Sequence, residues 1–321
     1  MIKYTKKDNG LQTEFEFIPS TTLPTDLPIS TPLTFTFIGE NLVITQKQNG
    51  DWDIPGGKIE SGETWHEALH REVREECGVT IDHVRLIGYI LAKNSGDLSL
   101  LKHEIINVLP VTVSFVQSVD LNWSKKETIN RDAPARDTVQ ELFTKRDDGG
   151  QLLEIFNYAI NDFKSQDYIS TFDYVKNMGD GEVYPNTQSV VFIKNKDNKF
   201  VLVRENGEIE FTLPGGGCHI YETGLDCVLR ESREETQIEI TDVRLIGTVI
   251  VKLFKGDKLL SVSTQQRYVA DIEEMYEFIP NKDGFEIEER KLVNFDELKG
   301  EAKILKNPTG DDILSDLKNF L

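Results

Sequence analysis

Three glutamates stand close together in REVREECGV, the segment at residues 71–79. In a helix each residue advances about 100°, so Glu72 and Glu76 project from one face and Glu75 lies at its edge. The neighbouring positions on that face are apolar: Ala68, Leu69 and Val73. Burying an unpaired carboxylate is costly. A face that combines acidic and apolar side chains in this way predicts a bound counterion.

The position of these acids along the helix leads to the same expectation. Glu75 and Glu76 precede Gly78 in the last turn, where the helix dipole favours cations. Like charges three or four positions apart also repel, at a cost of about 0.2–0.5 kcal/mol per pair. A hard divalent cation such as Mg²⁺, which takes oxygen ligands and shares them with phosphates, would turn this repulsion into binding. For one such helix alone, a solvated acidic face is the more common interpretation.

The same three acids recur later in the chain. RESREETQI, which begins at Arg230, repeats the segment that begins at Arg71 at an offset of 159 residues (230 − 71 = 159), and it carries Glu231, Glu234 and Glu235. HVRLIGYI returns as DVRLIGTV at the same offset. Repetition at one fixed spacing indicates a duplicated structural unit. Because the acids recur while positions around them differ, we interpret them as a site rather than as surface.

The elements that must position these acids have the same order in both copies. A strand-like run, LTFTFIGENLVITQ in the first copy and QSVVFIKNKDNKFVLVRE in the second, leads to an Asn-Gly turn and a Pro-Gly-Gly loop before the acidic helix. Further strand-like runs and an apolar-periodic helix close each copy. We expect a mixed α/β fold with domain 1 at residues 1–166 and domain 2 at residues 167–321.

Composition excludes several classes of function. The 321 residues carry a net charge of −19, which disfavours long nucleic acids and membrane surfaces as partners but leaves a small nucleotide accompanied by metal ions. No apolar run approaches the length of a membrane-spanning helix, and no secretory signal stands at the N-terminus. The three cysteines show no CxxC spacing, so we expect neither a disulfide framework nor a zinc ribbon. A cytoplasmic location is predicted.

The acidic segments also match a family motif. The first copy resembles the Nudix box, G-x5-E-x7-R-E-U-x-E-E-x-G-U with U a bulky aliphatic residue, at every fixed position: Gly57, Glu63, Arg71, Glu72, Val73, Glu75, Glu76, Gly78 and Val79. The second copy departs from the motif twice, with Ser232 at the aliphatic position and Gln237 at the second glycine. The chain therefore resembles a tandem Nudix hydrolase, and WDIPGGKIESGET is similar to its MutT-like branch.

The resemblance implies two tandem α/β/α sandwiches, each with a mixed β-sheet, that hydrolyse a nucleoside diphosphate linked to another group X with Mg²⁺ or Mn²⁺. Carried over by position, the metal ligands are the box glutamates and a glycine carbonyl before each box: Gly56, Glu72, Glu75, Glu76, Gly215, Glu231, Glu234 and Glu235. Glycine lets the backbone approach metal and phosphate closely. Arg71 and Arg230 are expected to hold Glu63 and Glu222 through charge-assisted hydrogen bonds.

The residue that accepts a proton from the attacking water is left open among several carboxylates. Within the boxes the candidates are Glu72 and Glu76 with their repeats Glu231 and Glu235, and outside them the candidates are Glu127 and Glu286, which also differ by 159. Trp52 and Phe211 precede the Pro-Gly-Gly loops and could stack on a nucleobase, or could simply close the core at a strand end.

The substrate branch and two other functions stay open at this point. The MutT-like resemblance implies a nucleoside triphosphate, including an oxidised one. The main alternative is a Nudix-fold sensor or scaffold that binds a nucleotide and in which one domain is inactive. HEALH, residues 66–70, formally matches a zinc-protease motif, but the second copy has LDCVL there, so a zinc metallopeptidase is a remote alternative.

The second copy carries its own expectations. Ser232 and Gln237 alter the scaffold and remove no carboxylate, so the second site is predicted to bind metal and to do chemistry. Gln237 either takes a left-handed backbone conformation or the helix ends differently. Because the linker near residue 166 is short, the two copies are predicted to pack as an intramolecular pseudo-dimer.

Overall fold

The computed structural model describes residues 2–8, 10–96, 105–124, 130–134, 136–146, 150–176, 184–280 and 287–321. The chain divides into two compact units. Unit 1 comprises residues 1–169 with 254–261, and unit 2 comprises residues 170–253 with 262–321. The domain boundary near residue 166 and the pseudo-dimer stay predictions.

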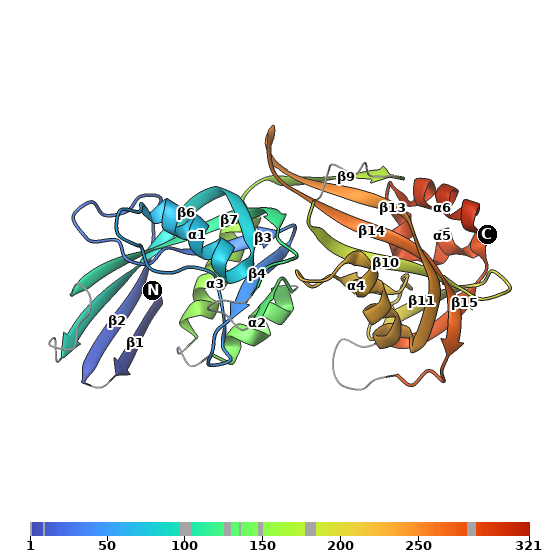
Figure 1. Ribbon diagram of the computed structural model, residues 1–321, viewed down its shortest axis with the longest axis horizontal. Coiled ribbons are helices and arrows are strands. Elements are labelled where there is room, and N and C mark those ends of the chain that lie inside the picture. The colour runs from blue at the N-terminus through green and yellow to red at the C-terminus, as the bar shows by residue number, and fades with distance from the viewer. Residues whose placement is uncertain are drawn as a thin grey trace. The chain divides into compact units, whose positions relative to one another are not determined.

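Unit 1 contains one mixed sheet with the strand order β1-β2-β6-β7-β3-β4-β5, and β8 pairs with β4 (Figure 1). Neighbouring strands of this sheet are antiparallel except β3 and β7, which are parallel. The strands are β1 Ile2–Asp8, β2 Leu11–Pro19, β3 Leu33–Ile38, β4 Asn41–Gln46, β5 Trp52–Asp53, β6 Val79–Gly96, β7 Ile106–Val119 and β8 Asn130–Asp132. A sheet with parallel and antiparallel pairs confirms the mixed sheet predicted for the first copy.

The described part of unit 1 contains three helices: α1 Trp65–Cys77, α2 Arg136–Thr144 and α3 Gln151–Ser165. The apolar period of QLLEIFNYAINDF predicts α3, whose buried stripe includes Phe156 and Phe163. These rings contact strand β3, with ring centroids 6.2 Å apart for Phe156 and Phe35 and 4.7 Å apart for Phe163 and Phe37. Helix α3 therefore anchors the side of β3 that Phe35 and Phe37 occupy.

Unit 2 repeats this plan with the strand order β15-β11-β10-β14-β13-β9, and β12 pairs with β10 (Figure 1). The parallel pair is β10 with β14. The strands are β9 Tyr168–Val175, β10 Asn186–Lys194, β11 Phe200–Glu205, β12 Gly215–Gly217, β13 Ile238–Lys255, β14 Lys258–Met275 and β15 Ile287–Val293. The helices are α4 Gly224–Glu231, which continues as a π-helical segment at Ser232–Thr236, α5 Leu298–Glu301 and α6 Gly310–Leu317.

The core of unit 2 has two layers because successive residues of β10 point to opposite faces of the sheet. Val190 and Phe192 face a cluster that includes Leu317 of α6. Val191 and Ile193 face a cluster that includes Val228 of α4. The sheet thus lies between α4 on one side and the C-terminal helices on the other, which is the predicted α/β/α sandwich.

The two sheets differ at one edge. Strand β2 pairs with β6 in unit 1 as β9 pairs with β13 in unit 2, but only unit 1 adds a further strand, β1, outside β2. Strand β1 therefore has no counterpart in the described part of unit 2.

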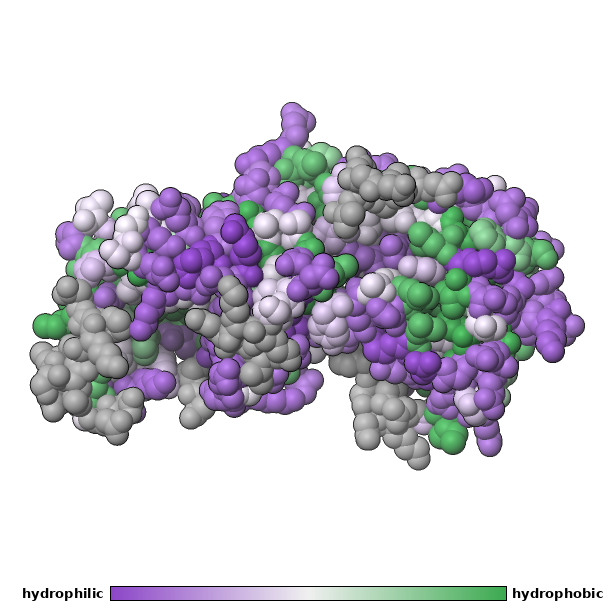
Figure 2. All heavy atoms as spheres, in the orientation of Figure 1, coloured by the Kyte–Doolittle hydropathy of each residue, from purple (hydrophilic) through white to green (hydrophobic). Residues whose placement is uncertain are grey.

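The exposed surface matches the acidic composition. The face drawn in Figure 2 is mostly hydrophilic, in keeping with 55 acidic residues against 36 basic ones. Among the described residues, no helix is both long and apolar enough to cross a lipid bilayer.

Candidate active site

Helix α1 starts at a capping box. The Thr64 hydroxyl accepts a hydrogen bond from the Glu67 N–H at 3.3 Å, and the Glu67 carboxylate accepts one from the Thr64 N–H at 2.8 Å. This reciprocal pair satisfies two N–H groups that the first helical turn leaves without partners. Glu67, the acid of HEALH, thus fixes the start of the helix.

Glu72 and Glu76 lie on the buried face of α1, as the helical spacing predicts. Their side chains are 10% and 5% exposed, whereas that of Glu75 is 35% exposed. Gly57 lies directly against Glu72, so that a Cβ at position 57 would overlap the carboxylate. Two carboxylates are therefore held under the Pro-Gly-Gly loop.

The loop contacts the second buried acid through its backbone. The Gly56 N–H donates to Oε2 of Glu76 at 3.0 Å. Gly56 has a φ of 153°, and a Cβ there would strike the backbone of Pro32 and Leu33. Only glycine combines that backbone angle with so close an approach.

Arg71 organises the outer acids. Its Nε and Nη2 donate to the two oxygens of Glu63 at 2.8 and 3.0 Å, and its Nη1 donates to Glu72 at 2.9 Å and to Glu75 at 3.4 Å. The hydrogen bonds from Arg71 lower the pKa of Glu63 to about 2. The predicted Arg71–Glu63 contact is confirmed, and the same guanidinium also orients two box glutamates.

Lys47 provides a cation on the inner side. Its Nζ contacts Oε1 of Glu76 in a short ion pair. Burial raises the pKa of Glu76, and Lys47 opposes that rise. Burial would lower the pKa of Lys47, but the attraction of Glu76 outweighs it and the pKa is raised.

Unit 2 reproduces the arrangement of acids around its own arginine. Arg230 donates to the two oxygens of Glu222 at 2.8 and 3.0 Å, to Glu231 at 2.7 Å and to Glu234 at 3.1 Å. The Gly215 N–H donates to Glu235 at 2.8 Å, as Gly56 does to Glu76. The predicted Arg230–Glu222 contact is therefore confirmed. The box glutamates of unit 2 have the same arginine and glycine partners as those of unit 1.

The two motif departures are compensated locally. The Ser232 hydroxyl, fully buried, donates to the Ile238 carbonyl at 2.9 Å. Gln237 has a left-handed backbone, φ 55° and ψ 40°, and its amide exchanges hydrogen bonds of 2.8 and 3.0 Å with the backbone of Ile279. The left-handed alternative for Gln237 is thus confirmed, and its side chain contributes bonds that glycine lacks.

The end of the second helix is also wound differently. Ser232–Thr236 is π-helical, and the Thr236 hydroxyl donates to the Ser232 carbonyl one turn back. Such back-bonding by Ser and Thr bends helices. The glutamates keep their partners despite the changed winding.

The electrostatic balance differs between the units. In the second copy Glu205 stands at the position of Lys47, because Val203 pairs with Thr212 and Arg290 as Thr45 pairs with Asp53 and Arg131. Burial raises the pKa of Glu235 to about 8, reinforced by Glu231, Glu205 and Glu234 and opposed by the Gly215 N–H. With Glu205 where unit 1 has Lys47, the second site concentrates more acid than the first.

Two arginines, one in each unit, bind carbonyl groups at the C-terminal ends of the two acidic helices. Arg131 donates to the carbonyls of Cys77 and Asp120, the latter at 2.7 Å, and stacks on Trp123. Arg290, 159 positions later, donates to the carbonyls of Thr236 and Tyr276, the latter at 3.0 Å. A cation at the C-terminus of a helix offsets its dipole. Sequence reasoning missed this pair, although the offset of 159 could have revealed it.

The NUDIX domain family model matches residues 34–135 and 184–316, which together are most of the chain. The chain belongs to the Nudix family. Its two matched regions confirm the tandem arrangement.

Curated relatives match short segments only. An oxidized purine nucleoside triphosphate hydrolase from Danio rerio is 40% identical over 52 residues, 16% of this chain and 33% of the relative. An 8-oxo-dGTP diphosphatase from Proteus vulgaris is 38% identical over 52 residues, 15% of this chain and 46% of the relative. In both cases the match spans less than half of the relative's length.

Solved structures cover more of the chain at lower identity. The Bacillus subtilis pyrophosphohydrolase BsRppH is 21% identical, with a TM-score of 0.36, over 47% of this chain and 91% of that chain. A UDP-X diphosphatase is 17% identical, with a TM-score of 0.33, over 57% of this chain and 89% of that chain. Likenesses this weak say nothing about substrate.

The donor chemistry of the Nudix helices fits Mg²⁺ or Mn²⁺. Glu72 and Glu76 offer buried hard oxygen atoms, as Mg²⁺ requires, and the buried Glu231 and half-buried Glu235 offer them in unit 2. Across the described residues no three His, Cys, Asp or Glu side chains form a complete metal-binding group. In unit 1 the oxygens of these acids are held by Arg71 and Lys47 instead.

The remaining predicted residues have varied surroundings. Trp52 is half-buried, and its carbonyl accepts a hydrogen bond from Arg146 at 2.6 Å. Phe211 packs against the unit 2 core, with Lys291 Nζ 3.6 Å from its ring centroid. Base stacking by these rings stays a prediction. Glu127 and Glu286 lie outside the described residues.

Proposed function

We propose that the first unit is a metal-dependent pyrophosphohydrolase that cleaves a phosphoanhydride bond in a nucleoside diphosphate linked to X. The observation that carries this proposal is the pair of buried carboxylates, Glu72 and Glu76, held between Arg71 and the Pro-Gly-Gly loop. Two carboxylates under one loop offer the hard oxygen ligands that Mg²⁺ or Mn²⁺ takes. Family membership supports the same reaction class.

The protein's contribution to the reaction follows from these contacts. A bound Mg²⁺ or Mn²⁺ would supply charge neutralisation of the diphosphate and acidify an attacking water, with Gly56, Glu72, Glu75 and Glu76 as its ligands. Arg71 orients Glu72 and Glu75 before substrate arrives. Lys47 brings a positive charge to the edge of the site, where phosphate oxygens would lie.

Glu76 is the favoured proton acceptor among the box carboxylates. Burial raises its pKa, which brings a carboxylate closer to the working pH of a general base. The Gly56 N–H fixes one of its oxygens and leaves the other toward Lys47. Glu72 is the second candidate, and Glu127 and Glu286 stay candidates from outside the described residues.

The substrate proposed is a nucleoside triphosphate, including an oxidised one. Two short matches, to an oxidized purine nucleoside triphosphate hydrolase and to an 8-oxo-dGTP diphosphatase, support this class together with the MutT-like WDIPGGKIESGET. We propose the same reaction class for unit 2, because Arg230, Glu231 and Glu235 keep their contacts through the π-helical turn.

A nucleotide-binding sensor is the second candidate, and it applies to unit 2. Its altered helix end and the glutamate, Glu205, in place of Lys47 are the observations that favour it. The zinc metallopeptidase gains no support, because Glu67 caps the helix through Thr64.

A substrate screen tests the proposal. The full chain is incubated with Mg²⁺ or Mn²⁺ and a set of nucleoside triphosphates, oxidised nucleotides and nucleoside diphosphate sugars, and mononucleotide, phosphate and pyrophosphate are quantified. We expect release of a mononucleotide that stops on exhaustive chelation and returns with added metal. Turnover that persists in chelator, or binding of nucleotides without any turnover, would argue against hydrolysis by this route.

A further inference from the structure

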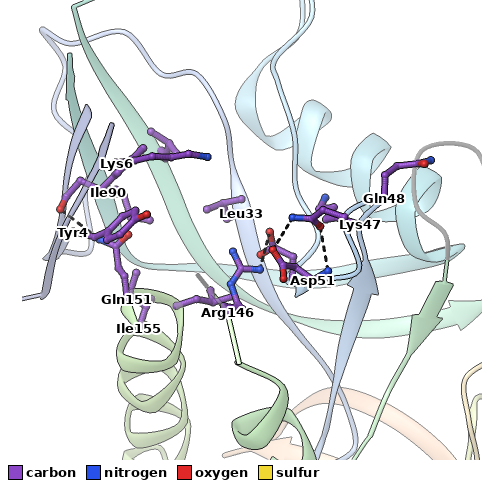
Figure 3. A pocket seen from close by; sticks show the side chains of 15 residues that line it. Tyr4, Lys6, Leu33, Lys47, Gln48, Asp51, Ile90, Arg146, Gln151 and Ile155 are labelled. Atoms are coloured by element: carbon purple, nitrogen blue, oxygen red, sulfur yellow. Dashed lines mark hydrogen bonds and ion pairs between the residues drawn. The ribbon is translucent and has the colours of Figure 1, made fainter. Parts of the chain in front are cut away.

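A pocket of about 660 Å³ opens in unit 1 beside the candidate site (Figure 3). Part of its wall is aliphatic, from Leu33, Ile90 and Leu109 on the sheet and Leu152 and Ile155 on α3. This volume is typical of small-molecule sites, and an apolar wall with a few placed polar groups is the usual way to hold an aromatic ligand.

One end of the pocket adjoins the catalytic acids. Lys47 lines the pocket and contacts Glu76, so a ligand with its phosphates near the acids would pass this ammonium. Arg146 and Asp53 line the same region and form an ion pair at 3.4 Å. The arginine is also fixed by the Trp52 carbonyl at 2.6 Å. This end is polar and preorganised.

The other part of the lining comes from the extra strand. Tyr4 and Lys6 are two positions apart on β1, and both line the pocket, as alternation along a strand requires. The Tyr4 ring stacks on Phe15 of β2, with centroids 6.1 Å apart and an interplanar angle of 17°. Figure 3 shows Lys6 on the far side of Leu33 from Lys47.

Lys6 differs from its neighbour Lys3 in its partners. Lys3 forms an ion pair with Glu16 at 3.2 Å. Lys6 is exposed and forms no ion pair with any residue that the structure describes. An ammonium group is a hydrogen-bond donor without acceptor capacity, so Lys6 offers donors to a ligand in the pocket.

Unit 2 does not repeat these features. It has no described strand equivalent to β1. At the sheet position where Leu33 pairs with Val111 in unit 1, Val190 pairs with Arg267 in unit 2. Arg267 is 1% exposed, and burial lowers its pKa to about 10. A buried guanidinium therefore stands in unit 2 at the place of Val111, so the sheets of the two units differ in charge beside this position.

We propose that this pocket binds the nucleobase of the substrate of unit 1, and that Tyr4 and Lys6 of β1 select a purine with a carbonyl oxygen on its edge. The ring lies on the wall that includes Tyr4, the phosphates lie toward Lys47, and Lys6 donates to the carbonyl. Lysine prefers the acceptor edge of guanine, whereas adenine presents an amino donor at the equivalent atom. This assignment rests on the proposed hydrolysis at the first site.

Steady-state kinetics on the full chain tests it, with Glu231→Gln and Glu235→Gln present throughout to silence unit 2. GTP, ATP and inorganic tripolyphosphate, which has no base, are compared. Tyr4→Ala is expected to raise KM for both nucleotides at least about fivefold, which is the smallest effect expected when a base loses its stacking ring. KM for tripolyphosphate should change little. Tyr4→Phe, which keeps an aromatic ring, should raise KM less than Tyr4→Ala does.

Lys6→Met is expected to reduce the preference for GTP over ATP at least about fivefold, mainly through KM. Lys7→Met, on the opposite face of the same strand, removes the same charge and should leave the preference unchanged. An equal loss for GTP, ATP and tripolyphosphate in Lys6→Met would mean that Lys6 attracts anions in general, which would overturn its role in base selection.

A binding measurement separates this proposal from the hydrolysis on which it rests. Equilibrium dialysis of GTP and ATP is repeated with Glu72→Gln added to the silenced chain, with and without Lys6→Met and Tyr4→Ala. A preference for GTP that these substitutions remove would support the pocket even if no hydrolysis is found. Hydrolysis that is indifferent to both substitutions would overturn the pocket and leave the reaction standing.

Discussion

The ammonium group of Lys47 contacts the Glu76 carboxylate, so a cation of the chain itself lies at the oxygen that a metal ion would need. Two positive charges at one carboxylate compete, because each raises the free energy of binding the other. Lys47→Met is therefore expected to lower the dissociation constant of Mn²⁺ at the first site by at least about threefold. Turnover should fall at the same time, because a charge that faces the phosphates is lost.

The second unit offers the reciprocal substitution. Glu205→Lys places an ammonium near Glu235, at the position that Lys47 has in unit 1, and should weaken Mn²⁺ binding at the second site. Calorimetric titration of the two variants, each with the other site silenced by glutamine substitutions, measures both effects. Unchanged affinities in both would mean that Lys47 does not compete with the metal.

Glu67 and Glu76 lie on different faces of α1, so their substitutions should affect turnover differently. Glu76→Gln keeps the shape of a buried side chain but removes its charge, and should reduce turnover at the first site at least about 100-fold. Glu67→Gln leaves the capping box intact, since glutamine also accepts from the Thr64 N–H, and should change turnover little. Initial rates at saturating metal, with unit 2 silenced, give the comparison. Similar losses in the two variants would refute the assignment of faces.

Arg131 connects the C-terminal end of α1 to the loop after β7, so its replacement should lower the free energy of unfolding. The Cys77 carbonyl, at the buried C-terminus of α1, and the Asp120 carbonyl would both lose a donor in Arg131→Met. The Asp120 carbonyl still accepts from the Trp123 N–H, so the main cost is the loss of a donor to the buried Cys77 carbonyl, about 1–3 kcal/mol. Urea unfolding followed by tryptophan fluorescence measures the change, since Trp123 stacks on this guanidinium. Arg131→Lys, which retains the charge, should lose less.

Periodicity and repetition were enough to predict much of this structure. The helical spacing placed Glu72 and Glu76 on a buried face, and the apolar period of residues 151–163 predicted α3. The 159-residue offset identified two copies of one structural unit and both sets of acids, whereas the sandwich architecture came from the family resemblance. These features are local or repeated, so they leave a mark in the sequence itself.

Other features depend on contacts between distant segments. In the π-helical turn the buried hydroxyls of Ser232 and Thr236 donate hydrogen bonds to backbone carbonyls. The spacing of residues in the sequence does not reveal these bonds. Lys47 and Glu76 are 29 positions apart and meet only once the sheet forms. The Asn-Gly dipeptide at residues 9–10 is typical of hairpin turns and so predicts a hairpin at the N-terminus. It does not predict that β1, paired with β2, forms the edge of the sheet.

Glu235 makes the second site sensitive to pH when metal is absent. Burial raises its pKa to about 8, well above the ordinary value of 4.5, so the folded state holds a proton that the unfolded state has lost between about pH 4.5 and pH 8. Stability falls with pH wherever the folded state binds more protons. The contribution of Glu235 is thus fully present below about pH 4.5 and is lost as pH rises through about 8.

This linkage predicts that metal binding at the second site releases a proton. At pH 7 Glu235 is mostly protonated without metal, and a carboxylate must lose its proton to act as a ligand. Mn²⁺ titration by calorimetry in two buffers with different ionisation enthalpies counts the protons. The full chain carrying Glu72→Gln and Glu76→Gln isolates the second site, and we expect close to one proton released per ion at pH 7 and few at pH 9. Adding Glu235→Gln should abolish both the release and the fall in stability above pH 6 in chelator. If the isolated second site binds no Mn²⁺ although unit 2 remains folded, its glutamates serve substrate recognition or structure, and the proposal of two working sites fails.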